Sequence, residues 1–301
     1  TAFIRNRQIR RDSLYIIVTR GSAAEFLKEN VPNIGSALSR RQENMMDQSL
    51  RTGFFPNTTY GELINDSKSF YGQPVVPLAA LNNFASIMNT EKPAELGFKN
   101  SGQYYAGELV RQGGSKIEFF GSAVFNGERM VGELDGDETR VMLMVLDEFQ
   151  RGSFALPDPK EPDVATTVEI RRQMKPEIRL DLKGEKPVVH VKLNLEGDIL
   201  AIQSTNQYEK KELKPIIENQ FEAFIKNTLD RTIHKCQHLN ADVFKFGLIA
   251  ARNFGTIQEW EDYRWPDKFR LAEVRTEVDF TIRRTGAMMK SSPIVKAQGE
   301  R

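Results

Sequence analysis

Apolar residues recur at helical spacing through the stretch from Tyr208 to Phe254. They share one face, while lysine, glutamate and asparagine occupy the other: Leu213, Ile217, Phe221, Phe224, Ile225, Leu229, Ile233 and Cys236. This spacing predicts a long amphipathic helix whose apolar face packs on another element. A break is expected around Leu239–Asp242, with Asp242 as the N-cap of a short helix over Val243–Arg252.

Alternating apolar and polar residues predict strands on both sides of that helix. Extended segments are expected at 165–173, 177–182 and 188–195, before it. A closing strand over Leu271–Arg283 should follow it, and its apolar face would hold Val274, Thr276, Val278, Phe280 and Ile282. The long helix therefore has a sheet on which to pack.

The segment Ile117–Leu134 predicts a β-hairpin. Asn126-Gly127 tolerates the positive φ angles of a tight turn. A helix over Glu138–Phe149 is expected next, with Asp137 as its cap and Gly152 as its stop. Thr139 and Arg140 are expected on its outer side.

The first part of the chain predicts shorter elements. Ser13–Thr19 resembles a buried strand, and Ser22 would cap a helix over 22–28. Further helices are expected at 34–51, with Leu38, Met45 and Leu50 inward, and at 60–69, with Thr58 or Thr59 near its start. Val75–Leu81 is apolar, but Pro74 and Pro77 restrict it to an edge strand or an extended segment.

Residues 82–115 are rich in Asn, Gly, Ser and Gln and have weak periodicity. They indicate a long connection, with a domain boundary near Gly113–Gly114. The expected domains are 1–113, a partial amino-terminal α/β-type domain with the connection, and 114–301. Strands and helices segregate in the second domain, which predicts a multi-domain α+β protein with a mostly antiparallel sheet under the long helix.

Composition excludes several classes of function. The formal net charge is +1, so bulk charge does not favour nucleic acid as a partner. A bilayer-spanning run of about 18 apolar residues is not found. Cys236 is the single cysteine, which rules out an intramolecular disulfide. The first residue is Thr1, so we expect a trimmed chain whose targeting segment precedes it.

We expect no catalytic, cofactor-binding or metal-binding motif in this sequence. His234 and His238 lie one helical turn apart, but Cys236 would point away from both, so it cannot complete a metal site with them. His190 falls on the polar face of a strand. Turn and capping roles explain the acidic run at 135–138 better than a calcium loop does. The aromatic residues Trp260, Tyr263, Trp265 and Phe269 form either core or an interaction patch.

The order of several segments resembles one family. GSAVFNGERMVGELDGDETR is followed by VEIRRQ, by a helix ending in HKCQHLNADVFKFG, by WEDYRWPDKF and by VRTEVDFTIRRTG. Together with FIRNRQIRRDSLYIIVTRGSAAEFL near the start, this order is similar to that of the C subunits of bacterial spore germinant receptors. Asp242, Phe244, Gly247, Trp260, Trp265 and Phe269 carry much of the resemblance and are the candidate structural or interaction residues.

The resemblance implies a non-enzymatic lipoprotein on the outer face of the spore inner membrane. Its lipid is attached to an amino-terminal cysteine that is absent from this chain. Its partners would be two integral membrane subunits, of A type and B type, and the complex would respond to nutrients such as amino acids or sugars. No cofactor is implied. The alternative is a nutrient-binding module in its own right. A partner surface is first expected at Asn82–Ser115 or at the hairpin tip, Asn126–Gly127.

Overall fold

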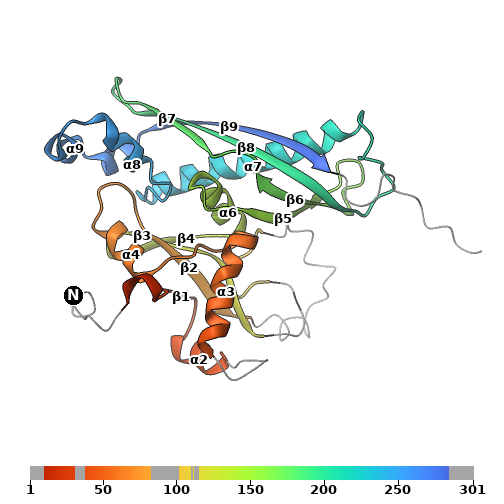
Figure 1. Ribbon diagram of the computed structural model, residues 1–301, viewed down its shortest axis with the longest axis horizontal. Helices are drawn as coiled ribbons and strands as arrows, with labels where there is room; N and C mark the ends of the chain where they lie inside the picture. The colour runs from red at the N-terminus through yellow and green to blue at the C-terminus, as the bar shows by residue number, and fades with distance from the viewer. Residues whose placement is uncertain (1–9, 31–37, 83–101, 110, 112–114, 285–301) are drawn as a thin grey trace, which may run out of the picture.

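The computed structural model describes residues 10–30, 38–82, 102–109, 111 and 115–284, with the backbone alone for 38–43. Two sheets are stacked with one helix, α6, between them (Figure 1). The class is α+β, as predicted, and the lower sheet in Figure 1 is built from the first part of the chain.

The first sheet has the strand order β1-β2-β3-β4. Its strands and the helices around it have these bounds: η1 Arg11–Ser13, β1 Val18–Thr19, α2 Ala23–Glu29, α3 Leu38–Thr52, α4 Tyr60–Ser67, β2 Val75–Leu81, β3 Ile117–Asn126 and β4 Arg129–Leu134. The predicted caps Ser22 and Thr59 both accept a backbone N–H in the first turn of their helices. Short helices thus begin where the sequence indicates.

Three local predictions for this half were wrong. Met46 and Ser49 are the buried residues in the described part of α3, Met45 packs partly buried against the core, and Leu50 is 36% exposed, so the inward position was wrong for Leu50. Of the strand predicted at Ser13–Thr19, only Val18–Thr19 forms β1, and η1 precedes it. β2 lies between β1 and β3, so it is not an edge strand. Pro77 is tolerated there because the short β1 pairs only with Leu78 and Ala79, and because a register shift after Pro77 accommodates its missing N–H donor.

The hairpin β3–β4 forms as predicted, one residue out of phase. Asn126 pairs with Arg129, so the turn residues are Gly127, with φ +60°, and Glu128. The hairpin pairs with β2 and completes the first sheet, whereas the sequence placed it with the sheet of the second domain. Gly113–Gly114, where the domain boundary is predicted, lies outside the described residues.

The second sheet has five strands and carries the long helix. The elements of this half are α6 Gly136–Val145, β5 Arg151–Pro157, β6 Ala165–Arg172, β7 Glu177–Asp181, β8 Val188–Ile202, α7 Lys214–His238, α8 Phe246–Ala250, η3 Ala251–Asn253, α9 Ile257–Tyr263, α10 Trp265–Phe269 and β9 Glu273–Arg284. β5 was not predicted, because Gly152 was expected to serve only as a helix stop.

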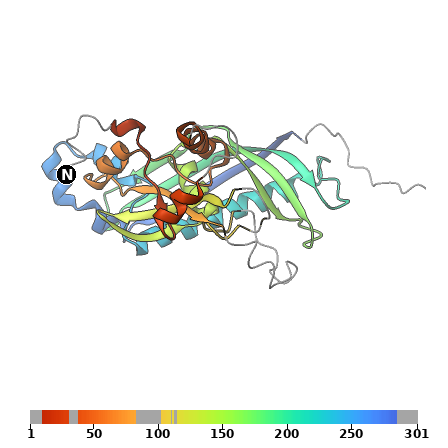
Figure 2. The ribbon, with the colours of Figure 1, turned by 90° about the horizontal axis from the view of Figure 1, so that it is seen from below.

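β8 is the spine of the second sheet. β6 and β7 pair antiparallel with successive parts of one of its edges, and β9 pairs parallel with the other. A parallel pair needs a crossover connection, which α7 to α10 supply. Figure 2 shows α7 running along the sheet. The predicted apolar stripe is buried from Ile217 to Cys236, except for Phe224, which is partly buried. Within the described residues, no helix has the length and hydropathy to span a bilayer.

Helix α6 joins the two sheets, and all of its residues are buried. Its N-cap is Asp135, not Asp137, and Asp135 forms a reciprocal capping box with Glu138. Thr139 and Arg140 were predicted to face outward, but they are 0% and 1% exposed. Periodicity gave the wrong outward face for this helix because both of its sides are covered, so its polar residues also face packed elements.

Candidate functional site

Asp242 is the centre of the candidate site. Its residue is 3% exposed, and its carboxylate accepts three hydrogen bonds. The Phe246 N–H donates to Oδ1 over 3.2 Å, and the Gly247 N–H donates to Oδ2 over 2.8 Å. The indole Nε1 of Trp265 donates to the same Oδ2 over 2.8 Å. One buried carboxylate therefore joins the start of α8 to α10.

The chain between α7 and α8 aims this carboxylate at the helix. Asn240 and Lys245 adopt positive φ angles of 50° and 56°, so the chain turns sharply after α7. The predicted capping role of Asp242 is correct in its chemistry, since its oxygens satisfy two N–H groups of α8. The predicted start of that helix is wrong, because α8 begins at Phe246 and Lys245 occupies the N-cap position.

Burial raises the pKa of the Asp242 carboxyl to about 6. The hydrogen bonds from Gly247, Trp265 and Phe246 favour the ionised form and offset only part of this effect. Cys236, the single cysteine, is also fully buried, and burial raises the pKa of its thiol well above the usual range. That thiol is a packing group and not a nucleophile.

Gly247 is required by the close approach of three segments. A Cβ on this residue would lie 2.6 Å from Cδ1 of Trp265 and 2.7 Å from the carbonyl oxygen of Tyr71. A larger side chain would therefore push α8 away from α10 and from the loop that holds Tyr71. This explains physically why the motif carries glycine at this position.

The predicted aromatic residues come together in one buried cluster. Trp260 stacks on Trp265 with ring centroids 6.2 Å apart, and Trp265 contacts Phe269 at 6.3 Å. Phe244 stacks on Phe246, which in turn contacts Phe269. The exposed fractions of Phe244, Trp260, Trp265 and Phe269 are 3% or less. Of the two interpretations, core and contact patch, the structure shows core for Trp260, Trp265 and Phe269, whereas Tyr263 is only partly buried against them.

A loop from the first half completes the cluster and was not found from the sequence. Tyr71 stacks on Trp260 with centroids 5.9 Å apart. The Gln73 N–H donates to the Asp242 carbonyl oxygen over 2.9 Å. Residues 68–74 carry only the turn-like signals of Gly72 and Pro74, so the sequence did not indicate that this loop belongs to the site.

The hairpin tip, one of the two expected partner surfaces, contacts its own chain. Asn126 Nδ2 donates to the Asn240 carbonyl oxygen over 3.1 Å, and the Gly127 N–H donates to Gln73 Oε1 over 2.8 Å. The hairpin tip thereby helps to hold the 68–74 loop, which contains Tyr71, in place. Most of the other expected surface, Asn82–Ser115, lies outside the described residues.

The histidines do not converge on a site. His238 Nδ1 lies 2.7 Å from the His234 carbonyl oxygen, which is the geometry of a helix end. Among the residues that the structure describes, no group of three or more His, Cys, Asp or Glu side chains could hold a metal ion. His190 lies on the outer face of the second sheet, between Arg179 and Arg275 in register.

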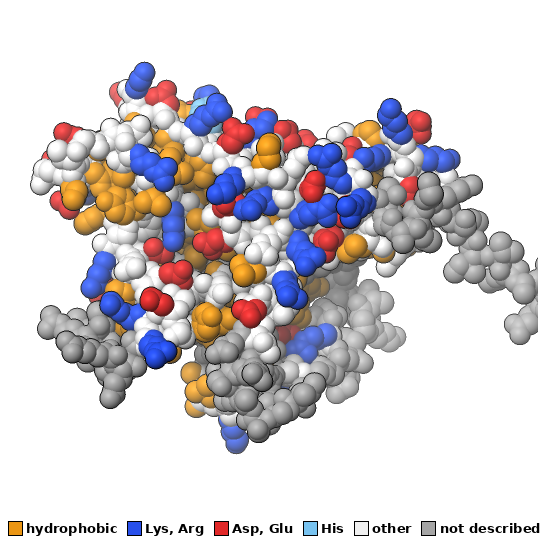
Figure 3. Space-filling model, in the orientation of Figure 1, with side chains coloured by type: hydrophobic (Ala, Val, Ile, Leu, Met, Phe, Trp, Pro, Cys, Tyr) orange, Lys and Arg blue, Asp and Glu red, His pale blue; other side chains and the backbone are white. Residues whose placement is uncertain are grey.

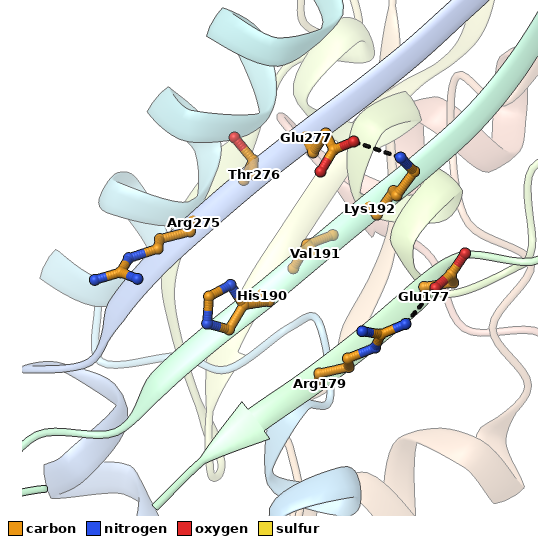
Figure 4. A pocket seen from close by; sticks show the side chains of 8 residues that line it. All are labelled: Glu177, Arg179, His190, Val191, Lys192, Arg275, Thr276 and Glu277. Atoms are coloured by element: carbon orange, nitrogen blue, oxygen red, sulfur yellow. Dashed lines mark hydrogen bonds and ion pairs between the residues drawn. The ribbon is translucent and has the colours of Figure 1, made fainter.

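That outer face carries an open depression with a volume of about 630 Å³ (Figure 4). Its charged side chains are engaged with one another, since Arg179 pairs with Glu177 over 3.0 Å and Lys192 pairs with Glu277. Such pairing on one face of a sheet is typical of a solvated surface. The depression offers charges of both signs without a buried reactive group.

A second buried charge, Arg140 of α6, joins the second sheet to the end of α3 and the loop after it. Its guanidinium carbon lies 3.5 Å from the ring centroid of Phe54 and 4.2 Å from that of Phe154 in β5. Its Nε donates to the Thr52 carbonyl oxygen over 3.0 Å, and its NH1 lies 3.8 Å from Asp137. Burial raises the pKa of Asp137 to about 6 and lowers the pKa of Arg140 to about 9.

Asp242 and Arg140 therefore both do structural chemistry. Asp242 ties α8, α10 and the loop at Gln73 together, and Arg140 ties α3, α6 and β5 together. Their hydrogen bonds go to backbone groups and an indole. The contacts of Asp242 join the two halves of the chain, since its carbonyl oxygen accepts from Gln73 and its carboxylate from Trp265.

Comparison with known proteins gives matches along the chain. Residues 120–286 match the family described as spore germination B3/GerAC like, C-terminal. Residues 1–81 match the spore germination protein N-terminal domain. The second match covers the half of the chain that carries the 68–74 loop, so both halves match domains of spore germination proteins.

Curated relatives agree. Spore germination protein B3 of Bacillus subtilis (strain 168) is 23% identical over 96% of this chain and 69% of its own length. Spore germination protein YndF of the same strain is 24% identical over 64% of this chain, and these residues span 48% of YndF. Spore germination protein GerQC of Bacillus cereus is 19% identical over 91% of this chain and 67% of its own length.

A solved structure supports the fold. The crystal structure of the GerBC protein matches with a TM-score of 0.61 and 17% identity, over 94% of this chain and 72% of that one. The chain thus has the α+β architecture of GerBC. On its family match over more than half its length, the chain belongs to the spore germination B3/GerAC-like family of germinant-receptor C-type subunits.

Proposed function

We propose that this chain is the ectodomain of a lipid-anchored, non-enzymatic subunit of a nutrient-germinant receptor. It is held on the outer face of the spore inner membrane by a lipid on an amino-terminal cysteine that precedes the present sequence. It works with two integral membrane subunits, of A type and B type, in the response to nutrients such as amino acids or sugars.

One observation carries the proposal: both family matches occur in order along a single chain, and the two matched parts are packed into one structure. The tie runs through Asp242, whose carbonyl oxygen binds the loop of the first half while its carboxylate binds α8 and α10. Such a rigid junction supports an adaptor role, because an adaptor has to hold its partner surfaces in a fixed relation.

Complementation in spores tests the proposal. The full-length gene should restore germination with nutrients to a strain that lacks its own copy, and the protein should fractionate with the inner membrane. A variant in which the amino-terminal lipid acceptor cysteine is serine should lose both properties. Full activity from a variant that is found in the soluble fraction would contradict the anchored-subunit proposal.

A second candidate is a small-molecule module, favoured by one observation, the depression lined by Arg179, His190 and Glu277. Side chains of both signs could bind an amino acid zwitterion. A thermal-shift series with amino acids and sugars tests this, since a ligand at 100 times its Kd stabilises a protein by about 2.7 kcal/mol. The receptor-subunit proposal ranks first because those side chains are already paired with each other.

A further inference from the structure

The hairpin tip holds the pair Asn126–Gly127, and no other asparagine in the sequence is followed by glycine. This pair is chemically labile. Glycine has no side chain to hinder its own backbone nitrogen, so that nitrogen can attack the side-chain amide of the preceding asparagine. In an unfolded chain, the tip is therefore the position at which an asparagine loses its amide group fastest.

In the folded protein, both reacting groups are engaged by distant segments. The Gly127 N–H donates to Gln73 Oε1 over 2.8 Å, and Asn126 Nδ2 donates to the Asn240 carbonyl oxygen over 3.1 Å. The attack requires the Gly127 nitrogen to give up its proton and to approach Cγ of Asn126. Because both hydrogen bonds oppose these movements, they have to open before the reaction proceeds.

The segments that accept these bonds are held in turn. The Gln73 N–H donates to the Asp242 carbonyl oxygen over 2.9 Å, and the Phe125 N–H donates to the Pro74 carbonyl oxygen over 3.1 Å. Figure 3 shows hydrophobic side chains gathered over the end of the molecule where the 68–74 loop meets α8. The tip is thus tied to a packed part of the protein. We call the hydrogen bonds among Gln73, Asn126, Gly127, Asn240 and Asp242 the junction.

Water nevertheless reaches the tip. Asn126 and Gly127 are both half-buried, and no described atom lies within 4 Å of the position that a Cβ of Gly127 would take. The water that the later step of the reaction consumes is therefore at hand. It follows that the junction protects the amide by its hydrogen bonds and not by burial.

We propose that Asn126 is a site of spontaneous deamidation, that the junction holds the reaction back, and that the reaction in turn opens the junction. The Gly127 nitrogen loses its proton and bonds to Cγ of Asn126, the Cγ–Nδ2 bond breaks, and ammonia leaves. Water then opens the cyclic imide at either carbonyl and yields aspartate or isoaspartate. The inference goes beyond the proposed function and does not depend on a lipid anchor or on membrane subunits.

Either product is incompatible with the junction. Aspartate has lost the donor Nδ2, so a carboxylate oxygen would face the Asn240 carbonyl oxygen, and two acceptors without a donor repel each other. Isoaspartate routes the backbone through the side-chain carbon, which moves Gly127 away from Gln73. The change is irreversible because the ammonia is lost.

Peptide mapping by mass spectrometry tests the protection. The purified protein is incubated in mildly alkaline buffer, and aspartate and isoaspartate at position 126 are followed with time. Gln73→Leu removes the acceptor and should speed the reaction about three- to tenfold. Gln73→Glu keeps an oxygen acceptor at this place and should react as slowly as the unsubstituted protein.

Two controls separate local opening from general loss of stability. Ile170→Val weakens the buried core of the second sheet by a comparable amount and should leave the rate at Asn126 unchanged. Asn253, which is exposed and followed by the bulky Phe254, should react at one rate in all of these proteins. An equal rate at Asn126 in Gln73→Leu and in the unsubstituted protein would overturn the inference, and so would an equal acceleration by Ile170→Val.

The unsubstituted protein provides a test that needs no variant. Asn126 should react more than about tenfold faster in guanidinium-unfolded protein than in folded protein, since both hydrogen bonds are then lost. The same rate in both states would show that the fold gives no protection.

Hydrogen–deuterium exchange tests the effect on the junction. Asn126→Asp has the side chain of the direct product and should raise the exchange rate of the Gln73 N–H about tenfold. Asn126→Leu removes the donor without adding an acceptor and should raise it less. Exchange at Gln73 that is as slow in Asn126→Asp as in the unsubstituted protein would overturn the claim that deamidation opens the junction.

Discussion

The indole Nε1 of Trp265 donates to Oδ2 of Asp242, whereas the neighbouring indole Nε1 of Trp260 is buried with no hydrogen-bond partner in the described part of the chain. The two tryptophans stack on each other with centroids 6.2 Å apart and are equally buried. They differ in one hydrogen bond. A comparison of the two tryptophans therefore distinguishes the contribution of the hydrogen bond to Asp242 from that of aromatic packing.

We expect Trp265→Phe to destabilise the protein more than Trp260→Phe does. Both substitutions remove comparable ring area, but only the first leaves a buried carboxylate short of a donor, which costs about 1–3 kcal/mol in addition. Urea denaturation at neutral pH measures the difference. Equal losses for the two variants would show that the Trp265–Asp242 bond contributes nothing beyond packing.

Gly247→Ala should also be strongly destabilising. The added methyl group would lie 2.6 Å from Trp265 Cδ1 and 2.7 Å from a backbone oxygen, so either α8 or the Tyr71 loop has to move. Overpacking of this kind costs about 1–3 kcal/mol. Gly255→Ala is the control, because its methyl group would meet nothing closer than 3.6 Å. A loss of stability no greater than that of the control would refute the steric argument.

The stability contributed by Asp242 should fall as pH rises. Its pKa is about 6 in the folded protein against 3.8 for the ordinary carboxyl, so the native state binds more protons between these values and loses stability as pH rises through 6. Relative to Asp242→Asn, the unsubstituted protein should therefore be more stable at pH 5 than at pH 8 by about 1.4 kcal/mol. A difference that does not change with pH would contradict the raised pKa.

Comparison with the asparagine variant is needed because burial also raises the pKa of Asp135 to about 7 and that of Asp137 to about 6. These two groups act in the same direction on the stability of both proteins. Guanidinium denaturation at the two pH values, analysed as the difference between the proteins, cancels their contribution as long as they remain independent of Asp242.

Arg140→Leu should cost about 3–5 kcal/mol, because it leaves the buried Asp137 without its charge partner. Addition of Asp137→Asn should recover part of the loss, since the unpaired charge is then removed. Arg140→Lys should rescue poorly, because an ammonium group does not present a flat face to the rings of Phe54 and Phe154. Failure of the double variant to recover stability would place the cost in the lost ring contacts.

Periodicity predicted the elements that have one dry face. The stripe of α7 and the alternation of β9 are buried as expected, because each has a solvent side that keeps its pattern visible. The fold class followed from the separation of strands and helices along the chain. The hairpin was found, but its pairing with β2 across residues 82–115 depends on a long-range contact that no local pattern contains.

Prediction failed where two sheets cover one helix. Arg140 is polar in the sequence and buried in the fold, and its partners Thr52 and Phe54 are distant in the chain. The candidate site was found in part: Asp242, Gly247 and Trp265 were selected, and the structure brings them into contact. Tyr71 was missed because a single aromatic residue in a turn-like segment carries no periodic signal.

The most direct test of the account is co-purification of the full-length lipidated protein from spore inner membranes, followed by mass spectrometry. The receptor-subunit proposal predicts that two integral membrane subunits, of A type and B type, are recovered with it in constant ratio. Recovery of the lipidated, membrane-bound protein alone, under detergent conditions that preserve other membrane complexes, would contradict the proposal.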